Sequence, residues 1–311
     1  MKKTVKPTYP AYKSDFLDVG HGHHLYYELY GNPKGKPVLY LHGGPGAGFR
    51  ERHKGFFDPK IWNVILFDQR GAGRSTPFAS LHENTTASLV KDINLLLDKL
   101  GLEKVLLFGG SWGSTLALVY AIENPKRVVG IITWGVFLCD RFDQKYYLEG
   151  GSADFAPEAW ERFASIVPKE HQSKPAPYYY RQMQGKNEKA KDMFAFEWTL
   201  YEWRLMDPDA SLEKLTREIK KEGFYKSLAP LEAHYILAGG FFPEGYILKN
   251  APKLKIPVTI VQGRYDYCCP PVSAYRLHKK IRGSKLIMVN AGHASSERPT
   301  TKKLIETLKD F

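Results

Sequence analysis

Long hydrophobic runs are missing from this sequence. No stretch approaches the roughly 18 to 20 apolar residues that a membrane-spanning helix requires. The first residues, MKKTVKPTYPAYKSDF, contain lysines but no apolar stretch behind them, so we expect no secretory leader. These two absences predict a soluble, cytoplasmic protein without a membrane partner.

Cysteine is also scarce. The 311 residues include three cysteines, Cys139, Cys268 and Cys269, which is an odd number with one adjacent pair. This pattern excludes a disulfide framework and suits a reducing compartment.

Acidic residues are outnumbered by basic ones. The chain has 45 lysines and arginines against 33 aspartates and glutamates, a formal net charge of +12. Such an excess can mark a nucleic-acid surface. Here the lysines are scattered, mostly as pairs on predicted helix faces such as Lys220 and Lys221, and no basic arm gathers them. We therefore expect solvated surface charge and no nucleic-acid partner.

Both ends of the chain alternate between β-rich and helical segments. Strands are predicted at 25–30, 37–41, 64–67, 105–108, 128–134, 257–262 and 285–289, and helices at 86–100, 272–281 and 301–310. This alternation is typical of an α/β fold with a mostly parallel, doubly wound sheet.

The middle third has a different character. The strand pattern stops near residue 140, and helices are predicted at 157–166, 188–206 and 212–222. We therefore predict a core domain made of residues 1–138 and 247–311, with a helical cap domain, residues 139–246, inserted into it.

The sequence Gly109-Gly110-Ser111-Trp112-Gly113 matches the G-x-S-x-G motif. It follows a predicted strand and precedes a helical run, which is the context the motif requires. Small residues permit a tight turn that exposes the serine hydroxyl, and the helix N-terminus favours developing negative charge. Ser111 is the predicted nucleophile; an ordinary glycine-rich turn is the alternative.

A glycine-rich loop, His42-Gly43-Gly44-Pro45-Gly46, follows the predicted strand 37–41. This is the position of the oxyanion loop in α/β-hydrolases. The expected donors to an acyl oxygen are the backbone amides of Gly44 and Trp112. His42 itself is expected to orient the loop and not to act as a base.

A serine nucleophile needs a base, and the base needs an orienting acid. Asp266 and His293 each directly follow a predicted strand and come in the chain order that this fold uses. Asp140, beyond the strand 128–134, is the competing acid.

Four other histidines are expected at the surface: His53, His82, His171 and His278. A metal site at His21, His23 and His24 is disfavoured, because no acidic or cysteine partners cluster nearby.

With these residues assembled, the chain closely resembles the prolyl aminopeptidases (proline iminopeptidases), which are serine peptidases of the α/β-hydrolase fold. The resemblance covers nearly the whole chain. The matching blocks are HGGPG at 42–46, DQRGAGRS at 68–75, GGSWGSTLAL at 109–118, QGRYD at 262–266 and AGH at 291–293.

The resemblance implies a substrate: a peptide with a free N-terminal proline. The family binds the N-terminal ammonium with two cap glutamates, which match Glu202 and Glu232, and lines its ring pocket with aromatics that match Phe137 and Tyr147. From the pattern alone, both glutamates would be taken as helix-surface charge. No metal or organic cofactor is implied, and the oligomeric state stays open between a monomer and a small homo-oligomer.

The sequence departs from the family pattern at four cap positions: Lys145, Tyr201, Pro230 and Ala233. None belongs to the predicted triad, so the departures bear on strictness for proline and not on hydrolysis.

Two other functions stay open. One is an esterase, lactonase or amidase that uses the same triad on a neutral acyl group, and the other is a non-catalytic binding protein of the same fold.

Overall fold

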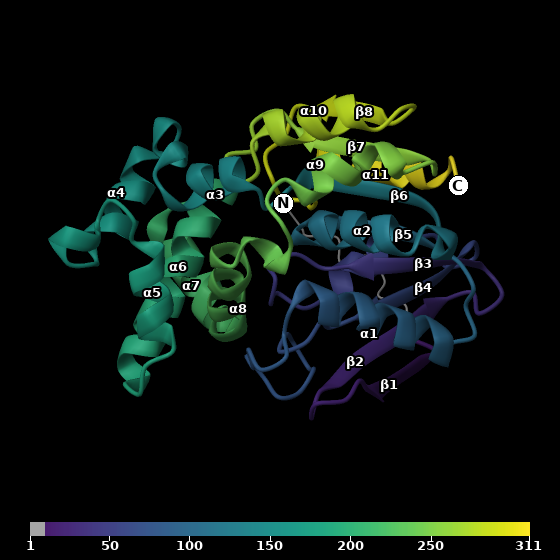
Figure 1. Ribbon diagram of the computed structural model, residues 1–311, viewed down its shortest axis with the longest axis horizontal. Helices are drawn as coiled ribbons and strands as arrows, with labels where there is room; N and C mark the ends of the chain where they lie inside the picture. The colour runs from purple at the N-terminus through teal and green to yellow at the C-terminus, as the bar shows by residue number, and fades with distance from the viewer. Residues whose placement is uncertain (1–9) are drawn as a thin grey trace.

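The computed structural model describes residues 10–311 (Figure 1). Residues 1–9 begin the N-terminal segment in which we expect no leader, and that expectation therefore lies largely outside the described residues. Within the described range, none of the helices combines the length and the apolar character needed to cross a membrane.

An eight-stranded sheet forms the centre of the molecule, in the order β1-β2-β4-β3-β5-β6-β7-β8. The β1–β2 and β2–β4 pairs are antiparallel and all other pairs are parallel. The strands are β1 (Lys13–Asp18), β2 (His24–Gly31), β3 (Lys36–Leu41), β4 (Trp62–Phe67), β5 (Val105–Ser111), β6 (Val128–Val136), β7 (Val258–Gly263) and β8 (Lys285–Val289).

The seven predicted strands correspond to β2 through β8, which confirms the mostly parallel α/β sheet. β1 has no counterpart among the predictions. Its sequence, KSDFLD, is polar at four of six positions, and only Leu17 is buried. Pairing with β2 at the sheet edge, and not an apolar pattern, holds this segment extended.

Helices cover both faces of the sheet. α1 (Thr86–Lys99), α2 (Trp112–Glu123) and α10 (Pro271–Lys280) pack on one face, where their apolar side chains join Leu39, Ile65 and Leu107. α11 (Arg298–Leu308) and the 3₁₀ helix η1 (Glu51–Phe56) pack on the other face, against alternate strand residues such as Val38 and Leu106. This period-two division of strand side chains is the expected pattern for a sheet covered on both sides.

Only helices lie between β6 and β7 in the chain. The last of them, Tyr246–Asn250, contacts α2 and α10, and the others gather beside one end of the sheet, coloured teal to green in Figure 1. The helices of this segment are α3 (Arg141–Leu148), α4 (Pro157–Ser165), α5 (Ala176–Met183), α6 (Glu188–Met206), α7 (Leu212–Glu222), α8 (Tyr225–Leu237) and α9 (Tyr246–Asn250).

α4, α6 and α7 lie within about one residue of their predicted positions. α3, α5 and α8 have no individual prediction; Pro230 inside α8 obscures its helical pattern. α8 contacts the core directly, because Ser227 Oγ donates to the carbonyl of Gly46 at 2.9 Å. The helical segment is thereby joined to the glycine-rich loop.

Candidate active site

The serine of the G-x-S-x-G motif occupies a strained turn between β5 and α2. Ser111 has φ 56° and ψ −129°, a backbone conformation that side-chain-bearing residues rarely adopt. A Cβ on Gly110 would overlap the ring of Trp134, and one on Gly113 would overlap the carbonyl of Leu41. The motif's glycines are therefore required by close packing around the turn.

Ser111 is half-buried and lines two pockets. Among residues 10–311 its Oγ has no hydrogen-bond partner. Because the hydroxyl is not engaged elsewhere, it is available to a substrate carbonyl at the N-terminus of α2.

Asp266 and His293 meet at the carboxyl ends of β7 and β8. Nδ1 of His293 lies 2.9 Å from Oδ2 and 3.0 Å from Oδ1 of Asp266, and both side chains are buried. With Nδ1 occupied by the carboxylate, Nε2 is the nitrogen left for proton transfer. His293 lines the same pocket as Ser111.

The Asp266 carboxylate is anchored by its surroundings. The backbone amides of Cys268 and Cys269 donate to Oδ1 at 3.0 and 2.7 Å, and Gln262 Nε2 donates to Oδ2 at 3.1 Å. The competing acid, Asp140, lies elsewhere: it caps α3 by accepting from the amide of Asp143, and it pairs with Arg276 at 2.6 Å. The structure thus brings Asp266, and not Asp140, to His293.

The charge state of His293 follows from opposing effects. Burial disfavours the imidazolium, but Asp266 and the neighbouring Cys269 outweigh it and raise the pKa of His293 well above its ordinary value. The interaction with Asp266 stabilises the imidazolium that forms when His293 takes a proton, which is the role of the acid in a serine triad.

The glycine-rich loop lies against the serine turn. Gly44 lines both pockets next to Ser111, and Trp112 is the first residue of α2, so its amide has no carbonyl one turn earlier to bind. His42 is buried and Nε2 accepts the amide of Gln69 at 2.9 Å. Gln69 in turn accepts from the indole of Trp112 at 3.0 Å. His42 therefore holds the loop, as predicted.

The expectation that His53 lies at the surface is wrong. Its ring is buried, stacks on Tyr40 with centroids 4.7 Å apart, and accepts the amide of Arg50 at 3.1 Å. The charged neighbours of His53 in the sequence conceal this aromatic contact. His23 is also buried, bonded through Nε2 to the carbonyl of His82 at 2.8 Å, at a turn.

Two carboxylates of the helical segment reach the site. Glu202 on α6 and Glu232 on α8 are both buried. The indole of Trp198 donates to Glu232 at 2.6 Å, whereas Glu202 has no hydrogen-bond or ion-pair partner among the described residues. Burial raises the pKa of Glu202 to about 7, and burial together with Glu202 raises that of Glu232 well above its ordinary value. A buried carboxylate without a charged partner is costly, so each glutamate is kept neutral by a proton unless a cation binds beside it.

A small inner pocket lies between Ser111 and Glu232. Phe137, Tyr147 and Ile236 line it together with Cys268 and Cys269. Its volume is about 10 Å³, room for roughly one water molecule, so a pyrrolidine ring enters only if these side chains shift. The hydroxyl of Tyr147 is buried without a hydrogen-bond partner.

An outer pocket of about 140 Å³ opens on the other side of Ser111. It contains Glu202 and His293, and its rim carries Arg50 and Arg52. The sequence gives no signal for these two arginines or for Ile236, because their importance depends only on where the fold places them.

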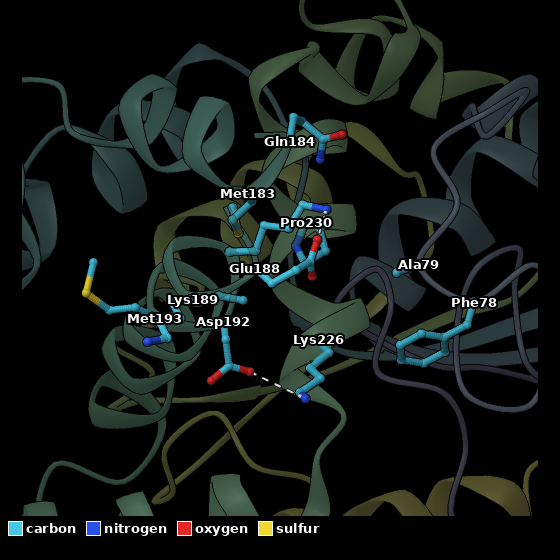
Figure 2. Close-up of a pocket in the computed structure, with 12 residues that line it drawn as sticks. Phe78, Ala79, Met183, Gln184, Glu188, Lys189, Asp192, Met193, Lys226 and Pro230 are labelled. Carbon is cyan, nitrogen blue, oxygen red and sulfur yellow. Dashed lines mark hydrogen bonds and ion pairs between the residues drawn. The ribbon is translucent and has the colours of Figure 1, made fainter. Parts of the chain in front are cut away.

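A larger cavity, about 860 Å³, lies away from this chemistry, between α5, α6 and α8 and residues Phe78 and Ala79 (Figure 2). Figure 2 shows Asp192 paired with Lys226 in it, at 3.5 Å. Pro230 also lines it. Since residues two apart on a helix point to different faces, Pro230 faces this cavity while Glu232 faces the inner pocket.

The other departures from the family pattern fall outside the pockets. Lys145 is exposed and Ala233 is buried. Tyr201 is buried beneath Tyr147: the rings stack with centroids 5.5 Å apart, and its hydroxyl donates to the Tyr147 carbonyl at 2.8 Å. Tyr201 thus supports a wall of the inner pocket without lining it.

Comparisons with known proteins agree with this geometry. The family described as alpha/beta hydrolase fold matches residues 36–298. A probable proline iminopeptidase of Leptolyngbya boryana is 40% identical over 99% of this chain and 97% of its own length. The proline iminopeptidase of Arabidopsis thaliana is 40% identical over 98% of this chain and 81% of its own.

Solved structures share the fold at low sequence identity. A proline iminopeptidase of Mycobacterium smegmatis has a TM-score of 0.62 at 18% identity, over 96% of this chain and 98% of its own. An esterase from Exiguobacterium antarcticum has a TM-score of 0.66 at 20% identity, with the same coverage. At such identities the likeness shows the fold alone. The sequence matches, in contrast, confirm the resemblance carried by the motifs: the chain belongs to the α/β-hydrolase fold family and, within it, to the proline iminopeptidases.

Proposed function

We propose that this protein is a serine exopeptidase that releases the N-terminal proline of peptides. The observation that carries the proposal is Glu202, a buried carboxylate without a partner in the same pocket as Ser111 and His293. A neutral ester has no use for buried negative charge, whereas a free N-terminal ammonium supplies the missing cation.

In the proposed mechanism, the substrate ammonium binds between Glu202 and Glu232, which places the first carbonyl at Ser111. Ser111 Oγ attacks as Nε2 of His293 takes its proton, while Asp266 holds the imidazole tautomer. The Oγ–Nε2 contact forms when the substrate is bound, since such contacts are often long without it.

The amides of Gly44 and Trp112 then stabilise the oxyanion; losing one such donor typically costs about 2.7–4 kcal/mol. His293 protonates the leaving amine, and water releases proline from the acyl-enzyme. Phe137 and Tyr147 would contact the proline ring.

The proposal extends to organisation and location. Residues 139–246 would act as a cap domain over a core made of 1–138 and 247–311, because both proposed ammonium ligands come from that segment. A cytoplasmic location fits the three free cysteines.

The test is hydrolysis of proline p-nitroanilide by the wild type and Ser111→Ala. N-acetylproline p-nitroanilide, alanine p-nitroanilide and p-nitrophenyl acetate are assayed beside it. We expect fast release from the free-amine proline substrate, abolished in the variant. Ester cleavage without aminopeptidase activity would instead favour an esterase, and full activity of Ser111→Ala would overturn the mechanism.

A further inference from the structure

Two thiols that line the inner pocket lie close to the proposed base. Cys268, Cys269 and His293 are buried, and one potential ligand atom from each lies within 4.8 Å of the others. Within residues 10–311 this is the one group of three histidine, cysteine or acidic side chains that meets this criterion. The catalytic scheme uses His293 but neither thiol.

We propose that these three side chains form an inhibitory binding site for a soft divalent cation of the Zn²⁺ or Cd²⁺ type. The inference rests on the proposed function, since the site acts by occupying the base of that mechanism. It concerns reversible inhibition and gives the metal no part in catalysis.

The backbone already holds two of the ligands in place. The amides of Cys268 and Cys269 both donate to Asp266 Oδ1, and the same carboxylate binds Nδ1 of His293. Nδ1 is therefore occupied and Nε2 is the ligand that His293 can offer. A carboxylate behind a metal-binding histidine is the usual arrangement in zinc proteins.

The geometry is close to that of a metal site. Sulfur ligands about 2.3 Å from a tetrahedral zinc ion are about 3.7 Å apart. The two sulfur atoms and one ring nitrogen of His293 lie within 4.8 Å of one another, so small side-chain shifts bring the two sulfurs to this spacing. The inner pocket, which both thiols line next to Ser111, provides the route in.

The ligand set selects the cation. Thiolate and imidazole prefer Zn²⁺, Cd²⁺ and similar ions, whereas Mg²⁺ and Ca²⁺ require oxygen ligands. On binding, the two thiol protons and any proton on Nε2 leave to solvent, and two metal–sulfur bonds and one metal–nitrogen bond form. Two thiolates neutralise the dication, so the buried site gains no net charge from the ion and its sulfur ligands.

This binding has a direct consequence for activity. The lone pair of Nε2 that binds the cation is the one that would take the proton of Ser111. A cation at this site therefore blocks the base and fills the inner pocket at once, and a chelator restores both.

The test is a titration of the reduced protein with Cd²⁺, in which binding is monitored by the ultraviolet thiolate-to-cadmium charge-transfer band. It compares the wild type with Cys268→Ser, Cys269→Ser and Cys139→Ser. Cys139 is a matched control, because it is also buried and free but lies outside the group. We expect one equivalent of Cd²⁺ to saturate the band in the wild type and Cys139→Ser, and Zn²⁺ to displace it. Replacing either pocket thiol should weaken Cd²⁺ binding at least tenfold. Replacing a residue that only supports a metal ligand already lowers metal affinity by about 10- to 100-fold, and a ligand itself should matter no less.

Inhibition by Zn²⁺ is measured in parallel, relative to the metal-free activity of each variant, with reversal by a chelator. We expect the half-inhibitory concentration to rise at least tenfold in both pocket variants and to be unchanged in Cys139→Ser. The proposal would be overturned if all variants had the same band intensity and the same half-inhibitory concentration of Zn²⁺. It would also be overturned if the wild type showed no band at one equivalent of Cd²⁺. The charge-transfer band is measured without substrate. If the protein is not a proline peptidase, the peptidase assay shows this, and the test of metal binding still holds.

Discussion

The indole of Trp198 donates a 2.6 Å hydrogen bond to the carboxylate of Glu232. Among residues 10–311, no other group donates a hydrogen bond to the carboxylate of Glu232 or of Glu202. The bond favours the ionised form of Glu232 against burial and the nearby Glu202, both of which raise its pKa. Trp198 lies outside the lining of both active-site pockets, so we regard it as a positioning residue.

Replacing Trp198 with phenylalanine should therefore impair binding of the substrate ammonium. A hydrogen bond to a charged group contributes about 1.5–3 kcal/mol, so kcat/KM for proline p-nitroanilide should fall at least tenfold at pH 7, mainly through KM. Activity should partly recover at higher pH, where Glu232 ionises without the indole. Trp160→Phe, in the same aromatic cluster but without a carboxylate partner, is the control. A pH-independent loss of kcat would argue against this role.

The glutamate pair should also make stability depend on pH. Burial raises the pKa of Glu202 from 4.5 to about 7, so the native state binds a proton that the unfolded state releases between these values. The stability that this proton binding at Glu202 contributes is complete below about pH 4.5 and is lost as the pH rises through 7. The difference corresponds to at most roughly 3 kcal/mol.

Glu202→Gln should accordingly be more stable than the wild type at pH 8 and similar to it at pH 4.5. Denaturant unfolding at both pH values measures this. Glu188→Gln, at an exposed position of the same helix, should change stability little at either pH. A variant less stable than the wild type at pH 8 would show that Glu202 has a stabilising partner.

Much of this arrangement could be predicted from the sequence. Strands β2 to β8 have apolar runs that identify them, and Ser111, Asp266 and His293 follow such runs directly, so chain order alone brings them to one edge of the sheet. The edge strand β1 and the helix α8 escape prediction, since pairing fixes the first and Pro230 interrupts the pattern of the second. The hydrogen bond from Trp198 to Glu232 depends on packing between two helices, which no local pattern encodes, whereas Cys268 and Cys269 lie near His293 as their positions just after Asp266 indicate.

Substituting the glycines of the serine turn tests how tightly it is packed. A Cβ on Gly110 would overlap the ring of Trp134, and overpacking of this kind costs about 1–3 kcal/mol. Displacing Ser111 by about 1 Å can lower activity on the order of a hundredfold. Gly110→Ala should therefore lose both stability and activity.

Gly55→Ala is the matched control, because a Cβ there meets nothing within 4 Å. It should stay within about 0.5 kcal/mol of the wild type, as surface substitutions usually do. Thermal unfolding and proline p-nitroanilide assays compare the two variants. Normal activity of Gly110→Ala would mean that the turn tolerates a shift of Trp134.

The last prediction concerns the two acids that the sequence offered. Asp266 contacts His293, whereas Asp140 binds Arg276 and caps α3. Asp266→Asn keeps the shape but allows the wrong imidazole tautomer, so kcat should fall on the order of 10⁴-fold. Asp140→Asn keeps a good helix cap but loses the charge paired with Arg276, so it should lower the melting temperature while leaving most of kcat. Because the two substitutions remove the same charge, their contrast separates catalysis from folding. A large loss of kcat in Asp140→Asn, with Asp266→Asn still active, would exchange the two roles and require the segment after β6 to move toward His293.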